Sequence, residues 1–96
     1  MSVVVLFCKD NAMFEMKIYI SHWCSPCVQT IKYLDKYYPY MKYLVVDVDE
    51  SPEEGKNNKV KNVPTICLES QGIEVERHVG FSKEVLDMLV FKTTLY

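Results

Sequence analysis

Residues 16–39 are MKIYISHWCSPCVQTIKYLDKYYP, a strand pattern followed by two closely spaced cysteines and then by a helical pattern. Residues 16–21 are rich in side chains that suit a pleated surface, and they predict a strand. A helix is expected from Ser25 to about Tyr38, because apolar side chains recur along one face at Val28, Ile31, Leu34 and Tyr38. Pro39 marks its end, since the residue before a proline disfavours helical backbone.

Two cysteines, Cys24 and Cys27, lie where the strand gives way to the helix. Thiols at i and i+3 can close a small disulfide ring and reopen it with little backbone movement. A cysteine at a helix N-terminus faces unsatisfied N–H groups and the positive end of the helix dipole, and both favour thiolate over thiol. We therefore expect Cys24 to have a lowered pKa and to be the attacking sulfur. Cys27, one turn inside the helix, suits the resolving role in thiol–disulfide exchange.

The remaining sequence continues to alternate strand and helix patterns. Further strands are expected at residues 3–8, 43–49, 65–69 and 73–79, a short helix within 52–62, and a last helix after an N-cap at Ser82. A short, glycine-containing connection makes the last two strands an antiparallel hairpin. Only about eight residues join the first two strands, fewer than a parallel crossover needs, so the N-terminal βα unit must be reduced.

This order predicts one α/β domain over residues 1–96, with a central mixed sheet of four to five strands and helices on both faces. A net charge of −2 argues against a nucleic-acid partner bound through a basic surface. The longest apolar run, residues 3–8, is too short to span a membrane, and no secretory signal is visible. We therefore expect a cytoplasmic monomer with no membrane partner. In the reducing cytosol a close cysteine pair is usually catalytic or metal-binding.

At Trp23-Cys24-Ser25-Pro26-Cys27 the chain resembles the thioredoxin family, whose motif is Trp-Cys-Gly-Pro-Cys, with serine here in place of glycine. Three further segments support the resemblance. Residues 47–52 are similar to the segment that closes the family's third strand, Val63-Pro64-Thr65 to its cis-proline region, and Val79-Gly80-Phe81 to the glycine before its last helix. The resemblance covers about residues 16 to 90.

The resemblance implies a thioredoxin-like fold and a thiol–disulfide oxidoreductase that reduces protein disulfides and is recharged by an enzyme of the thioredoxin-reductase type. It implies no metal and no cofactor other than the Cys24–Cys27 disulfide. A cis Val63–Pro64 bond would leave the Val63 backbone free to pair with an extended substrate. The implied docking surface consists of Trp23, Ser25, Pro26, Val63, Pro64 and Gly80.

The chain departs from the family's pattern beneath the cysteines. Thioredoxins usually carry a buried aspartate six residues before the first active cysteine, with a lysine beside it, and here these positions are Ile18 and Val45. Without the carboxylate, Cys27 must lose its proton through water or another group, and an apolar setting raises the pKa of a thiol. We therefore predict a reductase that is slower or shifted in its pH dependence.

Several alternatives stay open at this point. His22 could favour the Cys24 thiolate when protonated, although a solvated loop residue is the interpretation that we favour. A metal site could combine the two thiols with Cys67, Cys8 or His22, yet Cys8 and Cys67 are expected to be small buried hydrophobes. A glutaredoxin-like enzyme that uses glutathione is the main competing function. A non-catalytic metal-binding or clamp module is a third.

Overall fold

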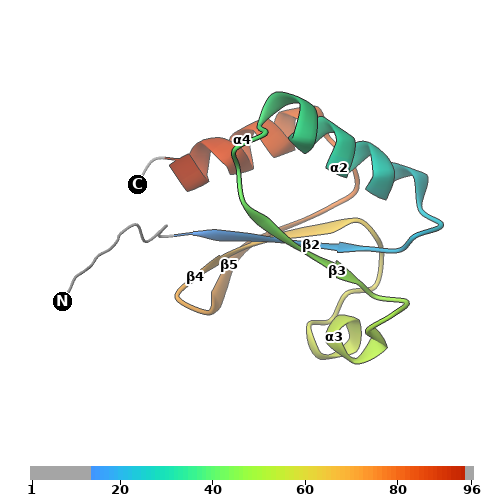
Figure 1. Ribbon diagram of the computed structural model, residues 1–96. Helices are drawn as coiled ribbons and strands as arrows, with labels where there is room; N and C mark the ends of the chain where they lie inside the picture. The colour runs from blue at the N-terminus through green and yellow to red at the C-terminus, as the bar shows by residue number, and fades with distance from the viewer. Residues whose placement is uncertain (1–13, 95–96) are drawn as a thin grey trace.

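The computed structural model describes residues 14–94, which form four strands and three helices (Figure 1). In chain order these elements are β2 (Glu15–Ile20), α2 (Ser25–Tyr37), β3 (Tyr43–Asp47), α3 (Pro52–Asn57), β4 (Thr65–Ser70), β5 (Ile73–Val79) and α4 (Lys83–Thr94). The elements follow the order expected from the sequence. The strand expected at residues 3–8, the Cys8 that it contains and the reduced N-terminal unit lie outside the described residues.

The four strands form one mixed sheet in the order β3-β2-β4-β5. β2 is parallel to β3 and antiparallel to β4, and β4 and β5 make the expected antiparallel hairpin. Gln71 and Gly72 at the tip of this hairpin have φ values of 54° and 82°. The helices α2 and α4 cover one face of the sheet and α3 lies on the other (Figure 1). The predicted α/β class and mixed sheet are therefore confirmed.

The main core lies between the sheet and the two helices α2 and α4. Strand alternation and helical spacing bring together Met16, Ile18, Ile66 and Leu68 from the sheet and Leu34, Leu86, Leu89 and Val90 from the helices. Burial of an aliphatic side chain of this size contributes about 1.5–3 kcal/mol relative to leaving it exposed. This layer therefore anchors α2, whose first residues carry the cysteine pair.

One face of α2 was predicted incorrectly at its N-terminal end. Val28 is 45% exposed, whereas Leu34 is fully buried as predicted, and the other buried positions of α2 are Cys27 and Thr30. These three buried positions are also spaced by three and four residues, so helical periodicity alone allowed either stripe. Cys27 therefore lies on the inward face of α2, and its neighbour Val28 lies on the exposed face.

An arginine on β5 binds the C-terminal end of α3 on the opposite face of the sheet. Arg77 donates through Nη2 to the carbonyl of Asn58 at 2.6 Å and through Nη1 to the carbonyl of Lys59 at 3.1 Å. These carbonyls directly follow α3, so the guanidinium neutralises the C-terminal end of that helix. The short helix expected within residues 52–62 ends at Asn57, and Val60 lies half-buried beyond it. The contact fixes the start of the segment that leads to Pro64.

Candidate active site

Cys24 is the N-cap residue of α2, and its sulfur takes the place of a capping oxygen. The Cys27 N–H donates to Cys24 Sγ at 3.2 Å, and the Val28 N–H donates to the Cys24 carbonyl at 3.2 Å. Pro26 occupies the first turn, where its missing N–H costs nothing. The sulfur thus lies where unsatisfied N–H groups and the helix dipole favour negative charge.

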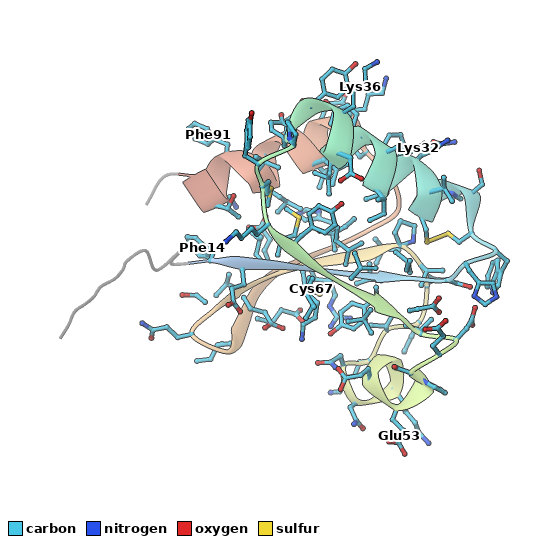
Figure 2. All side chains as sticks on the ribbon, viewed as in Figure 1. Phe14, Lys32, Lys36, Glu53, Cys67 and Phe91 are labelled. Carbon is cyan, nitrogen blue, oxygen red and sulfur yellow. A yellow bond between two sulfur atoms is a disulfide. The ribbon has the colours of Figure 1, made fainter. Side chains whose placement is uncertain are left out.

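Cys24 and Cys27 form a disulfide in this structure, with their Cα atoms 5.2 Å apart. Figure 2 shows it as a yellow bond at the N-terminal end of α2. Cys24 is 4% exposed and Cys27 is 1% exposed. The spacing therefore permits the ring closure that the sequence predicts, with both sulfurs sheltered from solvent.

The segment before β4 faces the disulfide. The Val63–Pro64 bond is cis, as the resemblance implies, and the Val63 carbonyl oxygen lies 3.7 Å from Cys24 Sγ. The Gly80 N–H donates to the Pro64 carbonyl at 2.8 Å, from a backbone with φ of 95° that favours glycine. The Val63 N–H donates to no group within residues 14–94. It is therefore available to an incoming backbone.

A groove of about 250 Å³ runs beside the disulfide. Its lining residues are Ser21, Trp23, Val48, Val60, Lys61, Asn62 and Val63. Trp23 is 73% exposed, so it is not a core aromatic. Ser25 and Pro26 are exposed next to it. These positions form a surface that is open to a partner.

His22 faces two carboxylates. Its Nδ1 lies 3.5 Å from an Oδ2 of both Asp47 and Asp49, and the imidazole side chain is 69% exposed. Asp49 also accepts a hydrogen bond from Ser21 Oγ at 2.5 Å. Desolvation raises the pKa of Asp47, but hydrogen bonds from the backbones of Asp49 and Glu50 and from His22 outweigh it, so that pKa is lowered. Neither carboxylate was predicted from the sequence as a partner of this histidine.

The alternative metal site built on thiols does not assemble among residues 14–94. The potential metal ligands that converge there are His22, Asp47 and Asp49, and no cysteine belongs to the group. Cys67 is buried in β4, as expected, away from the yellow disulfide bond in Figure 2. Burial and then the nearby Glu74 raise the pKa of its thiol to about 11. Cys67 therefore stays protonated near neutral pH and is a poor nucleophile.

The positions that depart from the family's pattern are apolar in the structure as well. Ile18 is fully buried and pairs across the sheet with Val45 on β3 and Ile66 on β4. Val45 is 40% exposed on the outer strand. Ile18 thus brings methyl groups to a position where the family usually has a carboxylate.

Comparison with known proteins agrees with this geometry. The family model described as Thioredoxin matches residues 9–91. The thioredoxin of Chlamydia trachomatis is 35% identical over 78 residues, covering 77% of this chain and 76% of that protein. The H-type thioredoxin of Fagopyrum esculentum is 32% identical over 81 residues, covering 81% and 70%. The crystal structure of thioredoxin NaTrxh from Nicotiana alata superposes with a TM-score of 0.73 at 29% identity, covering 85% and 74%.

Proposed function

The chain belongs to the thioredoxin family of thiol–disulfide oxidoreductases, and from this premise we propose that it reduces protein disulfides with Cys24 as the attacking sulfur and Cys27 as the resolving sulfur. The observation that carries this assignment is the hydrogen bond from the Cys27 N–H to Cys24 Sγ at the start of α2. Once the disulfide is reduced, the same N–H and the helix dipole stabilise a thiolate on Cys24.

The reaction has two exchange steps. The Cys24 thiolate attacks one sulfur of the substrate, a bond forms between these sulfurs, and the substrate disulfide breaks to release a thiolate. Cys27 then loses its proton and attacks Cys24 Sγ, which forms the Cys24–Cys27 bond and releases the second substrate thiolate. Two electrons pass from the protein to the substrate, and each released thiolate takes a proton. The protein ends in the disulfide form seen here.

The second step is the one that Ile18 affects. Cys27 is 1% exposed, and burial disfavours its charged form. Because the side chain at position 18 is aliphatic, it offers no oxygen to receive the proton. Water that enters with the substrate, or a group of the substrate itself, then serves as the acceptor. We expect resolution of the mixed disulfide to be slow near neutral pH and to speed up as the pH rises.

The docking surface proposed for the substrate consists of Trp23, Ser25, Pro26, Val63, Pro64 and Gly80. Trp23 offers a broad exposed face, and the Val63 N–H is available for pairing. The bond from Gly80 to the Pro64 carbonyl holds the two loops together. An extended substrate segment can then pair with the Val63 backbone while its disulfide meets Cys24.

The Cys24–Cys27 disulfide must be reduced again after each turnover. For this step we propose an electron donor of the thioredoxin-reductase type rather than glutathione. No cofactor beyond the cysteine pair is needed for the exchange itself. We place this monomeric reductase in the electron transport and redox homeostasis of the cytoplasm. Within residues 14–94, no helix is long and apolar enough to cross a membrane.

The test is turnover of insulin disulfides with thioredoxin reductase and NADPH, run beside glutathione with glutathione reductase. We expect turnover in the first system, its loss in Cys24→Ser, and a trapped mixed disulfide with Cys27→Ser. Cys67→Ala is the matched control, because that thiol is buried and protonated. Turnover with glutathione alone would instead favour the glutaredoxin-like alternative.

A further inference from the structure

The groove beside the disulfide is lined by one charged residue, which is positive. Of its lining residues, Lys61 is the only charged one; the others are apolar, aromatic, hydroxyl or amide side chains. Lys61 is exposed, and within residues 14–94 its ammonium group has neither an ion-pair nor a hydrogen-bond partner. Lys61 is thus an unpaired cation in a groove whose other described lining residues are uncharged.

The acidic side chains near the groove are already engaged. Asp47 accepts the Asp49 N–H at 2.8 Å and faces His22, and Asp49 accepts the Ser21 hydroxyl. Ser21 lines the groove, whereas neither aspartate does. Within residues 14–94 both carboxylates have partners other than Lys61, and neither forms an ion pair with its ammonium group.

We propose that Lys61 makes this groove select disulfides whose flanking sequence carries an acidic side chain. The inference rests on the proposed function, because Trp23 and Val63 belong both to the proposed docking surface and to the lining of this groove, so a segment that pairs with Val63 lies along the groove's wall. Val63, whose carbonyl lies 3.7 Å from Cys24 Sγ, is two residues beyond Lys61. An extended chain advances about 3.3 Å per residue, so a carboxylate about two or three residues from the target cysteine comes within reach of the lysine.

The size of the effect follows from the exposure of the pair. An ion pair between solvent-exposed groups changes a binding equilibrium by about two- to fivefold. Charges at the rim of an interface also act on the rate of encounter, and salt screens that contribution. The selection is therefore modest in magnitude, strongest at low salt, and expressed in the second-order rate constant of the first exchange step.

The experiment uses reduced full-length protein and peptides that each contain one disulfide. Paired peptides differ only in Glu or Gln at the second or third residue on either side of the target cysteine. Acid-quenched single-turnover reactions, separated by chromatography, give the rate constants for wild type, Lys61→Gln and Lys61→Glu. Lys42→Glu is the control for net charge, because Lys42 lies beyond the C-terminal end of α2 while the disulfide lies at its N-terminal end.

With wild type we expect at least one Glu peptide to react about two- to fivefold faster than its Gln partner at low salt, and the ratio to fall toward one at high salt. Lys61→Gln should abolish the preference, Lys61→Glu should reverse it, and Lys42→Glu should keep it. Equal rates for every peptide pair with wild type, or a preference that survives in Lys61→Glu, would overturn the selection and leave the reductase assignment intact. Failure to reduce any peptide would overturn both.

Discussion

Replacing Arg77 by methionine should loosen one wall of the groove while leaving the disulfide untouched. Methionine keeps an unbranched apolar stem and removes only the guanidinium. That group makes two bonds to the carbonyls of Asn58 and Lys59 and two bonds to the carboxylate of Glu74, at 2.9 and 2.8 Å. Each bond from a charged donor to a backbone carbonyl contributes about 1 kcal/mol here, and the partly exposed ion pair adds less than about 1 kcal/mol. We expect a loss of about 2–3 kcal/mol in the free energy of unfolding.

Urea unfolding followed by far-ultraviolet circular dichroism measures this loss, and hydrogen exchange locates it. Protection should fall in α3 and in residues 58–63 but persist in β4. Lys17→Met is the matched control, since Lys17 makes a 3.5 Å ion pair with Glu69 and, among residues 14–94, no bond to a backbone carbonyl. Because residues 60–63 line the groove, KM for protein disulfides should rise more than kcat falls. Equal destabilisation in the two variants, or unchanged protection of residues 58–63, would refute the role assigned to Arg77.

The same variant changes how stability depends on pH. The hydrogen bond from Arg77 is the largest influence on Glu74, and it lowers the pKa of that carboxyl below its ordinary value of 4.5. A lowered folded pKa stabilises the fold above the unfolded value, and this contribution is lost as the pH falls through the folded value. Arg77→Met should therefore flatten the loss of stability below pH 4.5.

Two further substitutions test how the helices are held. Asp87→Ala should lower the urea midpoint of unfolding, because the carboxylate accepts hydrogen bonds from the phenols of Tyr33 and Tyr38. An alkaline NMR titration should also show the pKa of Tyr33 falling from about 12 toward 10. Ser82→Ala should lower the free energy of unfolding by about 1 kcal/mol, since the Ser82 hydroxyl accepts the Val85 N–H. In the same urea unfolding assay Ser51→Ala should lower it less, because the Ser51 side chain makes no capping bond.

Local patterns predicted the elements well because each is specified by nearby residues. Alternation in β2, the cysteine pair at the start of α2 and the glycine of the β4–β5 turn all act within a few positions. Val28 was misassigned because an apolar side chain near the end of a helix fits a helical stripe whether or not the sheet extends beneath it. Periodicity records spacing along the chain and leaves open which of two adjacent stripes is covered.

The parts of the site that depend on distant segments were beyond a reading of the sequence. His22 and Asp47 are separated by 25 positions and meet only because β2 and β3 end side by side. Lys61 becomes significant only when the groove and its lining are known. The cis proline was anticipated through the family resemblance, since nothing in Val63-Pro64 itself distinguishes the two isomers.

The position of Trp23 determines what tryptophan fluorescence reports in this protein. It is the sole indole of the chain, it adjoins the cysteine pair, and 73% of its surface is exposed. Global melting can change its surroundings only slightly, whereas a bound peptide would cover it directly. Its emission is therefore a built-in reporter of docking at the redox centre.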